Sequence, residues 1–334
     1  MEMKSIRFRQ EREAGWRELE GLVTKAEKGG LRTLDADELM RLPRLYRAAL
    51  SSLSVARSIS LDRSLTAYLE SLAARAYLYV YGTRTDIPKA LARYFRHLLP
   101  ATVRGMARPL ALAILALGLG WIAGHTLTAH SPDWFYTLVD DGMAGGRTPT
   151  ASREFLEKSL YGGGPGPGFG LGVFATYLFT HNAAISMMSF ALGFALGIPT
   201  LLLLFYNGAT IGAMTAVFAS KGLGGEFFGW LAVHGSTELL AVALCGAAGL
   251  SIGGAVAFPG PHPRLATLAR TGRRAGVVVM GGVLMLLVAG GLEGFARQLV
   301  TDTTTRMLIG GAMLALWTAY FGFVGRGLGP ADVD

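Results

Sequence analysis

The stretch that decides the fold is Val233–Leu250, "VHGSTELLAVALCGAAGL". It is apolar enough to lie in lipid, and it belongs to a longer apolar run, Phe227–Phe258. Roughly 20 helical residues cross a bilayer core about 30 Å thick, so this run is longer than a straight crossing needs. We expect it to form one membrane span with an extra half-turn or a break.

Five further stretches meet the length of a membrane span. They are Pro109–Ala129, Leu171–Leu192, Ile198–Ala219, Gly276–Ala296 and Met307–Val324. Only 16% of the residues are charged and 51% are hydrophobic, whereas about a quarter of a typical soluble domain is charged. No alternating strand pattern is present. The sequence therefore predicts an all-α polytopic membrane protein with about six transmembrane helices.

The loop charges predict the orientation of these spans. Basic residues precede the first span (Arg93, Arg96, Arg104, Arg108), precede the fifth (Arg264, Arg270, Arg273, Arg274) and follow the last (Arg326). The loop from His130 to Gly170 carries Asp133, Asp140, Asp141, Glu154 and Glu157 against Arg147, Arg153 and Lys158. Six spans put all three basic groups on one side, whereas five or seven would split them. The positive-inside rule then predicts a multi-pass protein of the cytoplasmic membrane with both termini in the cytoplasm.

Four further features of the chain have ordinary explanations in a membrane protein. The net charge is +8. We interpret the basic residues behind it as the ones that flank the spans and set their orientation, and we expect no nucleic-acid partner. The charged start of the chain has no apolar core, so we expect no cleavable signal peptide. The single Cys245 lies in an apolar run and is expected to pack as a small hydrophobic residue. The segment "YGGGPGPGFGLG", Tyr161–Gly172, lacks the Gly-Lys-Ser/Thr ending of a phosphate-binding loop, and we expect a flexible connection.

Residues 1–104 are predicted to form a cytoplasmic helical segment, and residues 105–334 the six-helix membrane domain with an extracytoplasmic loop at about 130–170. Apolar positions recur at helical spacing, at Trp16, Leu19, Leu22 and Val23 and again at Leu39, Leu42, Leu45 and Tyr46. Asp35 and Glu38 form a capping pair for the second helix. A third helix is expected from Asp62 to about Tyr81, ended by Gly82. A three-helix bundle is the simplest arrangement.

The next stretch, "IPKALARYFRHLLP", separates apolar from basic residues at helical spacing. Leu91, Tyr94, Phe95 and Leu98 alternate with Lys89, Arg93 and Arg96. This pattern predicts an amphipathic helix at the inner membrane surface. A fourth helix of the bundle is the alternative.

Polar side chains lie inside four of the predicted spans. They are His181, Asn182, Asn207, His234, Glu238 and Glu293, and all fall in the extracytoplasmic half of the membrane. An ionisable group at mid-bilayer costs about 2.5–3.5 kcal/mol on insertion scales, so we expect these groups to face one another inside the bundle.

Three roles remain open for this cluster. The side chains act as interhelical hydrogen-bonding groups, helped by close-packing Gly208, Gly212, Gly246, Gly249 and Gly253. Alternatively they line a path for protons, ions or substrate. In the third case they serve catalysis or bind a metal, for which His181, His234, Glu238 and Glu293 are the candidate ligands. The His-Glu-x-x-His zinc pattern and nucleophile motifs are missing, so no cofactor is expected.

Several segments resemble the stage II sporulation protein M family. They are "REAGWRELEGL", "LPRLYRAAL", "THNAAISMMSFALG", "LLLFYNGATIGAM", "VHGSTELLAVALCGAAGLSIG" and "GGLEGF". The resemblance implies a polytopic inner-membrane protein of a long branch with an N-terminal cytoplasmic helical segment. In spore formers, members of the family act with partner peptidoglycan hydrolases during engulfment of the forespore.

These observations favour a non-enzymatic membrane scaffold that assembles a cell-envelope complex. Its partners would be the lipid bilayer, envelope proteins such as a peptidoglycan hydrolase complex, and a cytoplasmic protein docked by residues 1–104. Small-residue faces suggest a homodimer. The rivals are a channel or transporter with a path through the polar cluster, and a membrane-embedded metalloenzyme.

Overall fold

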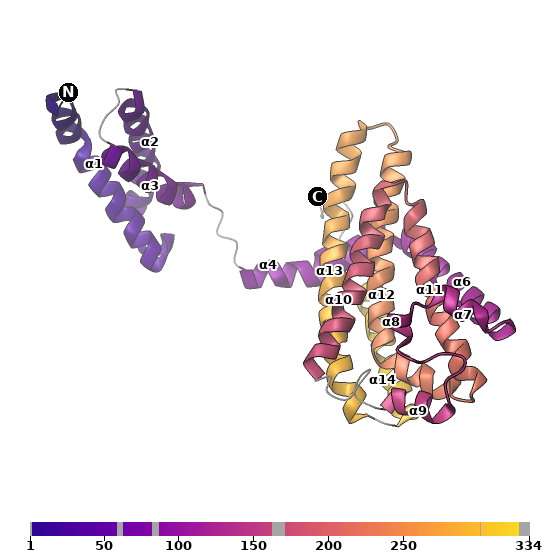
Figure 1. The fold of residues 1–334 in the computed structure, drawn as a ribbon. Helices are drawn as coiled ribbons and strands as arrows, with labels where there is room; N and C mark the ends of the chain where they lie inside the picture. The colour runs from indigo at the N-terminus through magenta and orange to yellow at the C-terminus, as the bar shows by residue number, and fades with distance from the viewer. Residues whose placement is uncertain (1, 59–62, 82–86, 162–170, 301, 327–334) are drawn as a thin grey trace. The chain divides into compact units, whose positions relative to one another are not determined.

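The structure is a computed structural model in which the main chain of residues 2–58, 63–81, 87–161, 171–300 and 302–326 is described, without the side chains of residues 2–7, 171–179 and 292–299. Across these ranges the chain is helical and contains no strand, as predicted (Figure 1). It divides into two compact units, Met1–Lys89 and Ala90–Asp334, each described by itself below.

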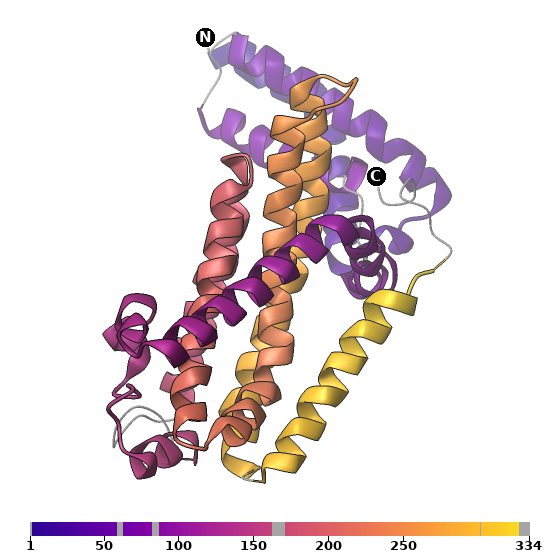
Figure 2. The same cartoon turned by 90° about the vertical axis from the view of Figure 1, so that its right-hand side faces the viewer.

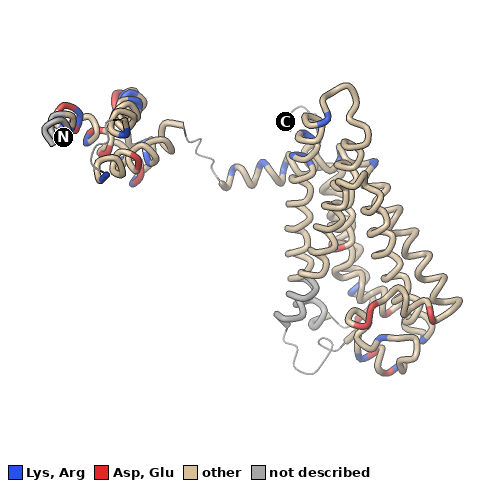
Figure 3. The backbone as a smooth tube through the Cα atoms, turned by 45° about the horizontal axis from the view of Figure 1, so that its top comes forward, with Lys and Arg blue, Asp and Glu red and all other residues tan. Residues whose placement is uncertain are grey.

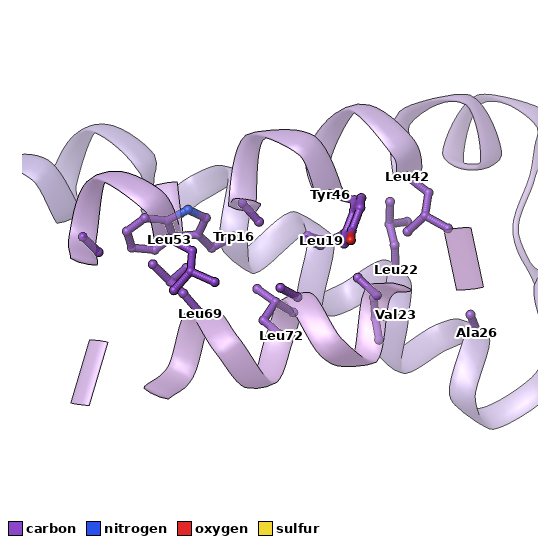
Figure 4. Packing of buried hydrophobic residues seen from close by; sticks show 14 of the residues in the cluster. Trp16, Leu19, Leu22, Val23, Ala26, Leu42, Tyr46, Leu53, Leu69 and Leu72 are labelled. Carbon is purple, nitrogen blue, oxygen red and sulfur yellow. The ribbon is translucent and has the colours of Figure 1, made fainter. Parts of the chain in front are cut away.

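The first unit is built from three helices around one core. The helices are α1 (Glu2–Gly29), α2 (Ala36–Ser58) and α3 (Arg63–Val80). Figure 4 shows the core side chains of all three helices, among them Trp16, Leu19, Leu22, Val23, Ala26, Leu42, Tyr46, Leu53, Leu69 and Leu72. The helical spacing predicted this packing, but Leu39 is exposed because it lies on the outer side of α2. Asp62 and Gly82, the predicted ends of the third helix, lie outside the described residues.

The capping pair before α2 is present in both directions. The Glu38 amide donates to Asp35 Oδ1 at 2.8 Å, and the Asp35 amide donates to Glu38 Oε2 at 2.9 Å. Lys25 of α1 also donates to the Glu38 carboxylate at 2.7 Å. This hydrogen bond is the largest cause that lowers the pKa of Glu38 below 4.5. The cap therefore joins the start of α2 to α1.

Asp35→Ala is expected to destabilise the first unit by about 1 kcal/mol, because it removes an N-cap acceptor. In a chain of residues 1–89 the loss should appear as a fall of about 4–8 °C in the thermal midpoint followed by circular dichroism. Asp37→Ala is the control, since Asp37 is exposed in the same turn and makes only a surface ion pair with Arg41. The contribution of Glu38 is present at neutral pH and should be lost as the pH falls through its lowered pKa. Equal midpoints for both variants would contradict the cap.

The segment after the first unit belongs to the second unit from Ala90 onward. It forms α4 (Ile87–Arg93), a π-helical turn (Tyr94–Leu98) and α5 (Leu99–Gly105). The Tyr94 hydroxyl donates to the carbonyl of Val277 at 2.7 Å, and Tyr320 donates to the carbonyl of Phe95 at 2.6 Å. These contacts exclude a fourth bundle helix from Tyr94 onward. The predicted boundary at residue 104 lies further along the chain than this division, and placement at the membrane surface stays a prediction.

The second unit contains the long apolar helices. After α5, its described α-helices are α6 (Ala107–His130), α7 (Asp133–Leu138), α8 (Asp141–Ala144), α9 (Arg153–Tyr161), α10 (Leu171–Ala191), α11 (Ile198–Ser220), α12 (Gly224–Ala257), α13 (Arg264–Leu299) and α14 (Thr303–Phe323). Within the described residues, five helices are long and apolar enough to cross a membrane: α6, α11, α12, α13 and α14. The sixth predicted span corresponds to α10, whose first nine side chains are not described. The Gly-rich segment 162–170 lies outside the described residues.

Helix α12 is the centre of this unit. It runs without a break and packs against α6, α10, α11, α13 and α14 (Figure 2). Of the two predicted alternatives, an extra half-turn or a break, the structure has no break, and the extra length extends the helix. Cys245 is fully buried among apolar neighbours on this helix, as predicted.

Glycines allow α6 and α11 to cross in close contact. Gly120 and Gly124 on α6 and Gly208 and Gly212 on α11 each face the main chain of the other helix, and a Cβ atom at any of the four would overlap it. The four-residue spacing on both helices is the small-xxx-small pattern of close membrane-helix pairs. The predicted packing role of Gly208 and Gly212 is thus confirmed. Because these faces are filled within the chain, a homodimer requires another surface and stays a proposal.

The predicted basic groups meet at one end of the unit. Arg104 of α5 donates to the carbonyls of Phe321, Val324 and Gly325 at the end of α14, and it shares a cavity with Arg270 and Arg274 of α13. Figure 3 shows Lys and Arg along the end that holds the loop between α12 and α13, and most Asp and Glu toward the opposite end. This is the distribution that six crossings predict.

Candidate functional site

The structure joins two of the predicted polar residues by a hydrogen bond between helices. Asn182 Nδ2 on α10 donates to Glu238 Oε2 on α12 at 2.8 Å. Glu238 is only 7% exposed, and His234, one turn earlier on α12, is 4% exposed. Two adjacent helices therefore hold a carboxyl group, an amide and an imidazole within one part of the bundle.

Neighbouring residues extend polar contacts across α12. The His234 ring meets the Trp230 ring edge-on, with 5.1 Å between centroids. Thr237, next to Glu238, accepts a hydrogen bond from Trp317 Nε1 of α14 at 3.0 Å. Polar side chains of α12 thus connect it to α10 on one side and to α14 on another.

The remaining predicted site residues lie on α10, α11 and α13. His181 is half-buried on α10, within electrostatic range of Asp140, the N-cap residue of α8. Asn207 is half-buried on α11, next to the glycine that packs against α6. Glu293 lies on α13, but its side chain is outside the described residues. The candidate site is therefore centred on Asn182, His234 and Glu238.

The chemistry available at this site is hydrogen bonding and proton exchange. A buried carboxyl group accepts a hydrogen bond when ionised and can also donate one when protonated. Across the described side chains, no group of three or more His, Cys, Asp or Glu residues is placed to hold a metal ion. His181, His234 and Glu238 accordingly do not form a ligand set in this part of the chain.

Arg306 is a buried charged residue that the polar pattern of the predicted spans did not indicate. It lies in the first turn of α14 and is only 1% exposed. Its Nε donates to the carbonyl of Val300 at 2.8 Å, and its guanidinium lies 4.9 Å from the centre of the Tyr161 ring. A lone arginine at the edge of an apolar span is a signal of a buried polar contact.

The fold and the site define an α-helical, multi-pass membrane protein whose central helix carries buried polar groups. The family model described as stage II sporulation protein M matches residues 110–296, which is more than half of the chain. The chain belongs to the stage II sporulation protein M family. Residues 6–82, within the first compact unit, match DUF8413, a domain of unknown function. The chain has no significant match among curated proteins or among solved structures.

Proposed function

We propose that this protein is a non-enzymatic scaffold of the cytoplasmic membrane that assembles a cell-envelope complex. In this proposal both termini lie in the cytoplasm, because the basic residues gather at the end of the bundle that holds the C-terminus of α14. The observation that carries the proposal is the first unit, which has a hydrophobic core of its own. A separately folded helical unit on a membrane protein is suited to docking a partner.

The first unit carries an exposed aromatic surface fit for docking, which we call the tyrosine patch: Tyr77 and Tyr81, which lie beside the buried ring of Tyr46. The rings of Tyr77 and Tyr81 lie 5.3 Å apart, and Tyr46 meets Tyr81 edge-on at 5.7 Å. Tyr77 and Tyr81 are 52% and 59% exposed, and Leu78 beside them is exposed as well. Exposed apolar clusters mark interaction sites, and tyrosine is enriched among the residues that dominate binding energy.

Deleting residues 1–89 is expected to abolish capture of the cytoplasmic partner, while residues 90–334 still insert into the membrane. The deletion ends at Lys89 because Tyr94, Phe95 and Arg104 make contacts of the second unit. Cross-linking in cells followed by affinity purification and mass spectrometry measures the captured proteins.

A double variant, Tyr77→Ala with Tyr81→Ala, should lose the same proteins as the deletion. Met40→Ala is the matched control, because Met40 is exposed on another side of α2 from Tyr46. Recovery of the same proteins with the full chain, the deletion and the double variant would exclude docking by the first unit.

The loop between α6 and α10 offers a second surface, for envelope proteins. Phe135, Leu156 and Leu160 of α7 and α9 are buried against Phe218 and Phe227 at the ends of α11 and α12. This packing holds the short helices on the bundle. The exposed aromatic side chains described here are Trp134, Tyr136, Phe155 and Tyr161. By resemblance within the family, the envelope partner is a peptidoglycan hydrolase complex.

A channel or transporter is the second candidate, favoured by the buried carboxyl group of Glu238 and its hydrogen bond with Asn182. Intramembrane ionisable residues commonly mark ion and proton pathways. In proteoliposomes this function predicts proton or ion flux that falls when Glu238→Gln removes the titratable group. Absence of flux from the unmodified protein over a range of ions and pH values would exclude this candidate and leave the scaffold.

A further inference from the structure

A basic cavity of about 590 Å³ opens in the second unit where α5, the end of α12 and the start of α13 meet. Three arginines line it, Arg104, Arg270 and Arg274, and none of the described residues that line it is acidic. The cavity is separate from the Asn182–Glu238 pair, and neither of those residues lines it.

The arginines divide into one structural residue and two that face the cavity from α13. Arg104 already donates to three carbonyls at the end of α14, and the negative end of that helix offsets part of its charge. Arg270 and Arg274 are four residues apart and share one face of α13. They supply the positive charge of the cavity.

Four hydroxyl groups line the cavity, and three of them donate to main-chain carbonyls, so one hydroxyl can donate to a ligand. Thr102, Ser251 and Thr267 donate to main-chain carbonyls at 2.6, 2.8 and 3.1 Å. Thr271, between the two arginines of α13, also lines the cavity. An anion in this space would therefore meet two guanidinium groups and one hydroxyl from a single helix.

We propose that this cavity binds a phosphate group, carried either by an anionic phospholipid or by a small soluble phosphate compound. Guanidinium groups form paired, charge-assisted hydrogen bonds with phosphate, and basic pockets between membrane helices suit lipid headgroups. The volume lies in the range of small-molecule sites. Met106 and Ala255 add apolar wall, and Phe258 is exposed at the rim, so the site matches a phosphate attached to an apolar chain.

The test uses the purified full-length protein in a neutral detergent and native mass spectrometry. Phosphatidylglycerol is titrated against phosphatidylcholine, and inorganic phosphate and glycerol 3-phosphate are titrated in parallel. Preferential binding of phosphatidylglycerol assigns the site to a lipid headgroup. Equal or tighter binding of the soluble phosphates assigns it to a soluble compound. Absence of binding by all of these probes overturns the proposal.

Two variants test whether the binding occurs in this cavity. Arg270→Gln with Arg274→Gln should weaken binding at least tenfold, since each arginine near a membrane surface contributes about 1 kcal/mol of attraction to anionic lipid. Gly254→Leu should weaken binding equally without changing the charge, because Gly254 lines the cavity and a Cβ built there meets no atom within 4 Å.

The matched control is Arg273→Gln, on the same helix turn but outside the cavity lining. It should leave binding within about twofold of the unmodified protein, because exposed charges away from a site are screened by salt. Helical content and a monodisperse elution profile establish that each variant is folded. If Arg273→Gln weakens binding as much as the double variant, or if Gly254→Leu leaves it unchanged, the ligand lies elsewhere and the proposal is wrong.

Discussion

Gly208→Leu and Gly212→Leu are each expected to destabilise the second unit by more than about 3 kcal/mol, beyond the usual range for overpacked cores. At both positions a Cβ atom would overlap main-chain atoms of α6. A main chain cannot move aside as the end of a flexible side chain can, so relief requires α6 and α11 to separate. Separation would also break the hydrogen bond from Trp121 Nε1 to Thr215 Oγ1, which joins these helices at 3.2 Å.

The measurement is the thermal midpoint of the full chain in detergent, with size-exclusion chromatography to detect aggregation. Gly118→Leu is the matched control, because it lies on α6 and a Cβ atom there meets nothing within 4 Å. It should shift the free energy of unfolding by no more than about 0.5 kcal/mol. If the Gly208→Leu and Gly212→Leu variants have the same thermal midpoint as Gly118→Leu, α6 does not pack on α11 through these glycines.

Glu238→Leu is expected to destabilise the bundle by about 1–3 kcal/mol, because it leaves the half-buried amide of Asn182 without its acceptor. Glu238→Gln keeps an acceptor oxygen and should cost less than about 1 kcal/mol. The free energy of unfolding in detergent distinguishes the two variants. If Glu238→Leu is as stable as Glu238→Gln, the hydrogen bond is not a stabilising contact between α10 and α12.

A double-mutant cycle isolates the pair from other effects at the site. It compares Asn182→Leu, Glu238→Leu and the double variant, and a coupling energy of about 0.5–1.7 kcal/mol is expected for a hydrogen bond between membrane helices. Coupling of Glu238 to Ser236 should be near zero, because the Ser236 hydroxyl donates to the carbonyl of Ala232 on its own helix. Equal coupling in both cycles would indicate a general loosening of α12 instead of a specific contact.

The local features of the chain followed directly from its sequence. The length and polarity of the apolar stretches predicted the membrane helices, and residue spacing predicted the three helices of the first unit. The pair Asp35 and Glu38 predicted a cap that the structure contains in both directions. Each of these depends on residues close together in the chain, so neither a distant partner nor the fold as a whole is needed to recognise them.

The contacts between helices could not be predicted in the same way. Their positions along the predicted spans place six polar residues at a similar depth, but only the folded chain joins Asn182 to Glu238, leaves Asn207 half-buried and encloses Arg306 beside Tyr161. Likewise, the pattern around Gly208 and Gly212 indicates close packing but not the counterparts on α6, Gly120 and Gly124. The sequence pattern indicates Arg104 only as a loop charge, whereas in the structure its guanidinium donates hydrogen bonds to carbonyl groups at the end of α14.

The sequence by itself thus determined the class of protein, its long helices and the end at which the basic residues gather, but not the short helices α7, α8 and α9. The tertiary structure alone decided which face of each helix meets a neighbour. The reason is that a lipid chain is as apolar as a leucine side chain, so the hydrophobic pattern of a membrane helix does not distinguish a lipid-facing from a protein-facing surface. In the first unit water makes that distinction, and there the pattern of Trp16, Leu19 and Val23 predicted the buried face.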